Sequence, residues 1–247
     1  MFFGLLFISN DGIYFNCALS LVIGVMLYEV YRSVKSHLAL YFSGFISAIM
    51  ILAALLFFKE AVSVALTVSV VVYLITMVFL HTKVDYRDIT SHCILTYYIT
   101  FFMGSLITIR NEYDVFAVLL VFICAWTTDT GAYFTGYFLG KHKLIPKVSP
   151  KKTVEGAIGG VIVCTICTYI YVHVLNLVDA GNVLYTCGFA AVISILSQFG
   201  DLVASAIKRD CGVKDFGNLL PGHGGLMDRF DSVAFIAPII MYLLKFI

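Results

Sequence analysis

The stretch LALYFSGFISAIMILAALLFF, residues 38–58, contains no charged side chain and is long enough to cross a bilayer as one helix. Similar apolar runs recur along the chain. We expect membrane spans at roughly 13–31, 38–58, 61–80, 89–109, 114–139, 154–177, 181–207 and 232–247. The sequence therefore predicts an all-α, polytopic integral membrane protein with about eight transmembrane helices.

The composition of the chain agrees with this fold class. Of 247 residues, 61% are apolar and 13% are charged, and the mean hydropathy is +0.97, which argues against a water-soluble fold. A formal net charge of +1 gives no basic field, so we expect no nucleic-acid partner. The seven cysteines fall mostly inside apolar runs, and we predict no disulfide scaffold.

The positions of the basic residues predict the orientation in the membrane. Most of the 16 lysines and arginines lie on one set of alternate loops, and cytoplasmic loops carry an excess of such residues. We therefore expect the two most charged loops, 140–153 and 208–231, on the cytoplasmic face.

One carboxylate lies inside a predicted span, in ICAWTTDTGAYFTGYFLG, residues 123–140. A charge at that depth is costly, so Asp129 is either a functional residue or the structural partner of a buried cation. The sequence alone leaves both interpretations open.

The next segment, GKHKLIPKVSPKKTVEG at residues 140–156, is rich in lysine. We expect Ser149 and Thr153 to act as caps of a helix that starts near Thr153. Lys151 and Lys152 then lie beside the start of that helix, where backbone N–H groups and lysines attract phosphate. Anchoring of the lysines on anionic lipid headgroups explains the same pattern, and the spacing does not decide between the two.

A polar stripe follows one face of the seventh predicted span. It recurs at steps of three or four residues and consists of Ser194, Ser197, Gln198, Asp201, Ser205 and Lys208. Small polar groups that join helices would explain the serines, but they do not explain an aspartate at the centre.

Charged residues and glycines crowd the segment that follows, 208–231. Asp228 and Asp231 are three residues apart and share a helix face, and the glycine-rich turn 221–225 lets backbone approach a ligand. His223 in that turn is either a phosphate ligand or a plain turn residue. Oxygen ligands select hard cations such as Mg²⁺, and the neighbouring lysines and arginines compensate phosphate charge. We expect a metal-assisted reaction on a phosphorylated lipid.

Three motifs give the C-terminal half a family resemblance. The run S-x-x-K-R-x-x-x-x-K-D followed by P-x-H-G-G-x-x-D-R-x-D, from Ser205 to Asp231, resembles the signature of the phosphatidate cytidylyltransferases, or CDP-diacylglycerol synthases. SPKKTVEG at 149–156 and D-T-x-A-Y-x-x-G at 129–136 resemble two further motifs of that family, in the expected order.

The resemblance implies transfer of the cytidylyl group from CTP to phosphatidic acid, giving CDP-diacylglycerol and pyrophosphate for phospholipid biosynthesis. It implies an enzyme of the inner (plasma) membrane that uses Mg²⁺, with two cation sites, and whose partners are CTP, phosphatidic acid and membrane lipids. A homodimer is left open. The chain would be a single membrane domain, with scaffold helices in 1–110 and catalytic helices and cytoplasmic loops in 111–247.

The resemblance implies that Asp201 and Asp228 are metal ligands, and our interpretation of the charged segments adds the other roles. The catalytic residues would be Asp201, Asp228, Lys208 and Arg209, and the metal ligands Asp201 and Asp228, with Asp231 as a further candidate. Substrate contacts would come from Ser149, Lys151, Lys152, Asp129, Ser205, Lys214, Asp215, His223, Gly224 and Arg229.

A cation- or proton-coupled transporter built around Asp129 and Asp201 is the alternative from another class. It would explain carboxylates inside the membrane, but it leaves the lysine-rich and Gly-His-Gly-Gly segments without a role. A CDP-alcohol phosphotransferase is disfavoured because its D-G-x-x-A-R pattern is absent.

Overall fold

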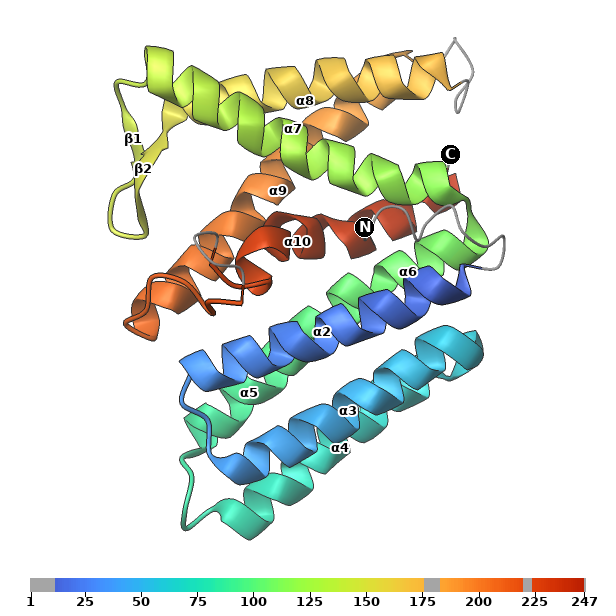
Figure 1. Ribbon diagram of the computed structural model, residues 1–247, viewed down its shortest axis with the longest axis vertical. Helices are drawn as coiled ribbons and strands as arrows, with labels where there is room; N and C mark the ends of the chain where they lie inside the picture. The colour runs from blue at the N-terminus through green and yellow to red at the C-terminus, as the bar shows by residue number, and fades with distance from the viewer. Residues whose placement is uncertain (1–11, 176–182, 220–223, 247) are drawn as a thin grey trace. The chain divides into compact units, whose positions relative to one another are not determined.

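The computed structural model describes residues 12–175, 183–219 and 224–246, and most of them are helical (Figure 1). The helices of the first half are α2 (Ile13–Ser33), α3 (Leu38–Phe57), η2 (Lys59–Ala61), α4 (Val62–Leu80), α5 (Tyr86–Tyr97), the π-helix η3 (Tyr98–Phe102) and α6 (Met103–Glu112). The second half contains α7 (Val115–Leu139), β1 (Lys143–Ile145), β2 (Ser149–Thr153), α8 (Val154–Val174), α9 (Val183–Asp210), α10 (Met227–Leu243) and η5 (Leu244–Phe246).

Seven helices in the described residues are long and apolar enough to cross a membrane. They coincide with the first seven predicted spans, although the predicted span 89–109 lies inside a longer helix, Tyr86–Glu112. The eighth predicted span corresponds to α10, which has 17 residues. The fold class is thereby confirmed as an all-α membrane protein, with one small two-stranded sheet in the described part of the chain.

The chain divides into two compact units, each of which is described here by itself. Unit 1 comprises residues Met1–Tyr113 and Cys211–Phe230, and unit 2 comprises Asp114–Asp210 and Asp231–Ile247. The first turn of α10 therefore belongs to unit 1 and the rest of that helix to unit 2.

A buried polar network connects the helices of unit 1. The hydroxyl of Tyr73 on α4 lies 2.6 Å from Thr96 Oγ1 and 2.8 Å from His92 Nδ1, both on α5. The hydroxyl of Tyr31 on α2 lies 2.6 Å from the same threonine oxygen. Apolar solvent offers no hydrogen bonds, so polar side chains in membrane helices satisfy one another and join the helices.

One turn of the helix 86–112 has π geometry, at Tyr98–Phe102. A π turn contains one residue more than an α turn and occurs mostly as a single turn inside an α-helix. Here α5 precedes it and α6 follows it without a break in the chain of helical residues.

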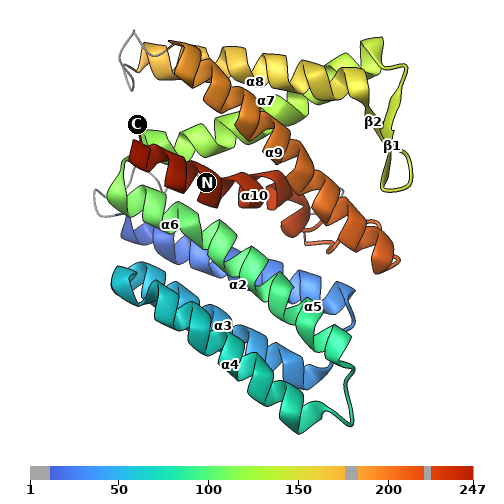
Figure 2. The same cartoon turned by 180° about the vertical axis from the view of Figure 1, so that it is seen from behind.

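In unit 2, small residues bring α7 and α8 close together, and the two helices run side by side in both views (Figures 1 and 2). A Cβ atom on Gly156 would lie 2.7 Å from the carbonyl oxygen of Ala132, and one on Gly160 would lie 2.8 Å from that of Thr128. Backbones can approach this closely only where side chains are minimal, as is common between membrane helices.

The lysine-rich segment before α8 forms an antiparallel hairpin, with Lys143 opposite Thr153 and Ile145 opposite Ser149. The prediction that Ser149 caps a helix is wrong, because Ser149 lies in β2. Thr153 is the N-cap as predicted, and its Oγ1 accepts a hydrogen bond from Gly156 N at 3.1 Å. Glu155 accounts for the hairpin, because its carboxylate accepts the backbone N–H groups of Lys141 and His142 and draws the loop back to the start of α8.

Candidate active site

The ionic centre of unit 2 is a pair between Lys152 on β2 and Asp201 on α9. The Lys152 Nζ atom lies 2.6 Å from Asp201 Oδ2, and the two side chains are 23% and 32% exposed. Lys152 also donates to the carbonyl oxygen of Gln198 at 3.4 Å, and Ser205 Oγ donates to Asp201 Oδ1 at 3.3 Å. The helix cap at Thr153 fixes where β2 ends, and so it places Lys152 beside the polar stripe of α9.

Two more carboxylates belong to this ionic centre. Asp231 on α10 is 8% exposed and interacts electrostatically with Asp201, Asp129 and Lys208. Asp129 on α7 interacts with the charges of Asp201 and Lys152. Three predicted acidic residues and two predicted lysines therefore gather from four elements of unit 2. Buried like charges are unfavourable unless cations compensate them, so the cluster is suited to bind further positive charge.

The polar stripe of α9 has a second role away from this centre. Thr128 Oγ1 donates to Ser194 Oγ at 2.8 Å, and Gln198 Nε2 donates to Ala157 O at 3.1 Å. These contacts attach α9 to α7 and α8. The serine part of the stripe thus joins helices, and the part around Asp201 carries the charge.

The hairpin and the end of α9 carry the other predicted basic groups of unit 2. Arg209 Nε donates to Val148 O at 3.4 Å, which connects α9 to the hairpin turn. Lys151 is exposed, and Ser149 is half-buried on the same strand. Ser149 and Lys151 thus lie within the lysine-rich segment, and Arg209 lies beside it.

In unit 1, Asp228 at the start of α10 contacts the C-terminal loop, of which residues 211–219 and 224–226 are described. Its Oδ2 atom accepts hydrogen bonds from Phe216 N at 2.9 Å and from Gly225 N at 3.0 Å. Gly224 has a φ of +82°, which side-chain-bearing residues rarely adopt, and a Cβ there would lie 3.5 Å from Asp215 Oδ1. The glycine therefore serves a turn between two predicted acidic residues.

The positions of the other predicted residues of this loop are as follows. Lys214 and Arg229 are exposed and belong to unit 1. His223, for which two roles were left open, lies outside the described residues.

The sequence assigned Glu29 on α2 to the scaffold, within reach of Arg32, and gave it no role in the site, but Glu29 contacts this loop. Glu29 Oε2 accepts hydrogen bonds from Leu226 N at 2.7 Å and Met227 N at 3.1 Å, and the residue is only 6% exposed. An acidic residue inside a predicted span was the one available signal for it.

The donor chemistry of the two units fits a hard cation. Among the described residues, no group of three or more His, Cys, Asp or Glu side chains is arranged to hold a metal ion. Mg²⁺, however, is usually bound through one or two carboxylates, with the remaining ligands from water and substrate phosphates. Asp201 and Asp231 in unit 2 and Asp228 in unit 1 offer such carboxylates.

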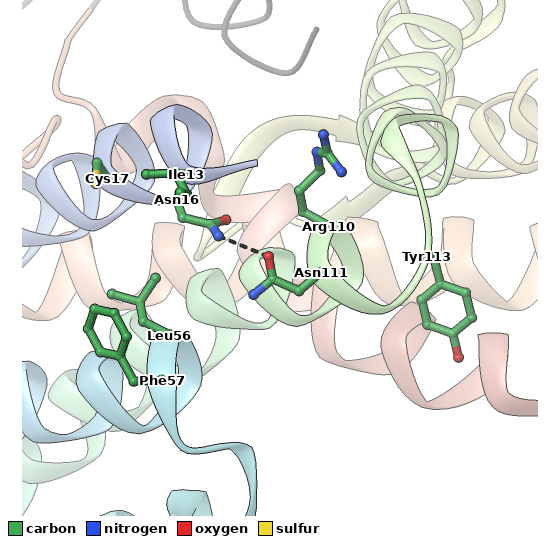
Figure 3. A pocket seen from close by; sticks show the side chains of 8 residues that line it. All are labelled: Ile13, Asn16, Cys17, Leu56, Phe57, Arg110, Asn111 and Tyr113. Atoms are coloured by element: carbon green, nitrogen blue, oxygen red, sulfur yellow. Dashed lines mark hydrogen bonds between the residues drawn. The ribbon is translucent and has the colours of Figure 1, made fainter. Parts of the chain in front are cut away.

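Two of the cavities in the structure are lined by described residues of unit 1. One, of about 480 Å³, lies between α2 and the C-terminal loop, and its lining includes Glu29, Arg32, Lys35 and the predicted Asp215. The other, of about 460 Å³, contains none of the predicted site residues (Figure 3). Its lining consists of Ile13, Asn16, Cys17, Leu56, Phe57, Arg110, Asn111 and Tyr113, and Asn16 Nδ2 donates to Asn111 Oδ1 at 2.9 Å.

In the described part of the chain, seven helices able to span a membrane and an ionic centre formed by α7, β2, α9 and α10 define a polytopic membrane protein with a charged site. The chain belongs to the Cytidylyltransferase family, whose sequence profile matches residues 1–247.

Three similar proteins are phosphatidate cytidylyltransferases. The one from Thermotoga maritima is 39% identical over 157 residues, which cover 62% of this chain and 58% of that protein. The one from Bacillus subtilis is 44% identical over 140 residues, covering 56% and 51% respectively. The one from Staphylococcus aureus is 48% identical over 129 residues, covering 51% and 48%. The chain spans about half the length of these relatives.

Proposed function

We propose that this chain transfers the cytidylyl group of CTP to phosphatidic acid, producing CDP-diacylglycerol and pyrophosphate for phospholipid synthesis. Membership of the Cytidylyltransferase family and the names of the similar proteins support this activity. The structural observation that carries the proposal is the pair between Lys152 and Asp201, with Asp129 and Asp231 in electrostatic contact. The transporter alternative has no comparable support.

The residues of the ionic centre suit transfer between two anions. A phosphatidate oxygen attacks the α-phosphorus of CTP, and the bond to pyrophosphate breaks. The attacking oxygen is already negative, so this chain need not supply a strong general base. Lys152 and Lys208, with Arg209 and Lys151 nearby in unit 2, compensate phosphate charge. A bound triphosphate competes with Asp201 for the ammonium group of Lys152.

We further propose Mg²⁺ as the cofactor, with two cation sites. Asp201 and Asp228 would hold the ions, and Asp231 would be a further ligand. When bound, Mg²⁺ would neutralise and orient the phosphate oxygens. In this proposal Asp201, which pairs with Lys152, and Asp228, which accepts backbone N–H groups, would be the carboxylates that hold the cations.

The remaining predicted contacts complete the substrate site of the proposal. They are Asp129, Ser149, Ser205, Lys214, Asp215, His223, Gly224 and Arg229. We place the site at the cytoplasmic face of the plasma membrane, where CTP is supplied, and leave the oligomeric state open.

Conversion of labelled CTP tests the proposal directly. Purified protein in lipid nanodiscs, given phosphatidic acid, CTP and Mg²⁺, should release pyrophosphate and CDP-diacylglycerol, and a chelator should stop the reaction until Mg²⁺ is restored. Asp201→Asn and Asp228→Asn should each abolish turnover, because each removes a charge that binds the cation. Asp210→Asn, which removes an exposed carboxylate at the end of α9, is the matched control and should leave turnover unchanged.

The transporter alternative gives a different result in the same preparation. Ion or proton uptake into sealed vesicles without any CDP-diacylglycerol would overturn the proposed function. Full activity of purified Asp201→Asn would overturn the metal assignment and leave the activity standing.

A further inference from the structure

We infer that Glu29 on α2 is a positioning residue for the proposed reaction, because it fixes the start of α10 and thereby the carboxylate of Asp228. This inference rests on the proposed function for its catalytic consequence. The contacts themselves lie wholly within unit 1.

Glu29 caps α10 from a different helix. The first backbone N–H groups of any α-helix have no partner within the helix, and a carboxylate is a favourable acceptor there. In this protein the N–H groups of Leu226 and Met227 donate to Glu29 Oε2 at 2.7 and 3.1 Å, and α10 begins at Met227. An acidic side chain from α2 therefore accepts the hydrogen bonds that a Ser, Thr or Asp at the N-cap position usually accepts.

The same stretch of α2 also contacts the C-terminal loop at Phe216. Ser33 lies one turn after Glu29, and its Oγ donates to Phe216 O at 2.8 Å and to Glu29 O at 2.9 Å. Phe216 N in turn donates to Asp228 Oδ2 at 2.9 Å. Two side chains of α2 thus hold Phe216 and Leu226, and Asp228 accepts a hydrogen bond from the backbone of Phe216.

Two glycines of the loop, Gly217 and Gly225, leave room for the Glu29 carboxylate. A Cβ on Gly225 would lie 2.7 Å from Glu29 Oε2, and a Cβ on Gly217 would overlap the same carboxylate. The backbone can approach Glu29 from both sides only because these positions lack side chains.

The burial of Glu29 raises the cost of losing its hydrogen bonds. Glu29 is 6% exposed, and a buried carboxylate is costly unless hydrogen bonds compensate it. Two backbone N–H groups donate to one oxygen of this buried side chain, so Glu29 fixes the position of the backbone one residue before Asp228. A displacement of about 1 Å at a reacting group costs about a hundredfold in rate, which gives such fixing a catalytic consequence.

Three substitutions at position 29 separate positioning from a direct role of the charge. Glu29→Gln keeps an oxygen at the same reach and removes the charge, Glu29→Asp keeps the charge and shortens the reach, and Glu29→Ala removes both. If Glu29 acts by position, Glu29→Gln retains kcat/KM to within a few-fold, and Glu29→Asp and Glu29→Ala lose about tenfold or more. If the charge acts directly, for example on a cation, Glu29→Asp outperforms Glu29→Gln, and that order would overturn the inference.

Amide hydrogen exchange supplies a readout that does not depend on activity. In Glu29→Asp and Glu29→Ala, the amides of residues 226 and 227 should exchange faster, whereas Glu29→Gln should stay near the unmodified protein. Glu60→Ala, which removes an exposed carboxylate of the same unit, should change neither exchange nor kinetics. Faster exchange with unaltered kinetics would also overturn the inference, because the position of α10 would then not matter for turnover.

The two proposals fail in distinguishable ways. If the unmodified chain converts no CTP, the proposed function fails, and exchange at 226 and 227 still decides whether Glu29 fixes the start of α10. If Glu29→Ala does not fold, Glu29→Asp and Glu29→Gln carry the comparison by themselves.

Discussion

At the scale of single residues, neighbouring lysines have different surroundings. Lys152 is paired with Asp201, whereas Lys151, the preceding residue on β2, is exposed. Alternate residues of a strand point to opposite sides, which explains the difference. The sequence motif gives no reason to distinguish the two lysines, whereas the structure shows that their contacts differ.

We expect Lys152→Gln to damage the proposed reaction more than Lys151→Gln. The first change leaves the partly buried carboxylate of Asp201 without its lysine, and the second removes one exposed charge that water replaces easily. Steady-state kinetics with CTP should show a loss of about tenfold or more in kcat/KM for Lys152→Gln and a few-fold loss for Lys151→Gln. Equal losses would mean that both lysines contact the nucleotide in the same way.

The sequence singles out a candidate site residue where one position carries its own signal. Asp129 and Asp201 could be found because a carboxylate in an apolar span is unusual. The partner of Asp201 could not be found, because the pairing depends on how β2 meets α9. The contact of Glu29 with the loop could not be predicted for the same reason, because Leu226 N, which donates a hydrogen bond to its side chain, is 197 residues away in the chain.

At the scale of elements, the interface between α7 and α8 depends on glycine. A Cβ on Gly159 would overlap the side chain of Thr135, and a Cβ on Gly131 would come too close to the side chain of Val163. Long apolar runs predicted these helices well, because length and hydrophobicity alone define a span. The hairpin was not predicted, since strands of three and five residues give too little alternation to detect.

Gly159→Ala should destabilise the protein by about 1–3 kcal/mol, because the added methyl group has no space between the helices. Thermal unfolding in detergent measures the change. Gly188→Ala in α9 is the matched control, since a Cβ there has nothing within 4 Å, and alanine is the better helix former. The control should unfold at the same temperature or higher, and a similar loss in both variants would contradict the packing argument.

At the scale of the whole molecule, the distribution of charge predicts which face of the membrane each loop occupies. The positions of the basic residues predict that the hairpin turn and the C-terminal loop share one face. Single cysteines at Lys147 and Asn218, in a chain without other cysteines, should react with an impermeant thiol reagent from the cytoplasmic side. A cysteine at Asn111 should react only from the opposite side. Labelling of positions 147 and 218 from different sides would contradict this topology.

The π turn at Tyr98–Phe102 has a consequence for how this chain tolerates changes in length. Loss of one residue from an ordinary α-helix rotates everything beyond it by about 100°, because each residue advances the helix by that angle. Loss of one residue from the π turn instead converts it to an α turn and leaves both flanks facing as before. His92 and Thr96 on one side and Arg110 on the other would keep their neighbours. Within the helix 86–112, this turn is therefore where a one-residue deletion should be best tolerated during evolution or engineering.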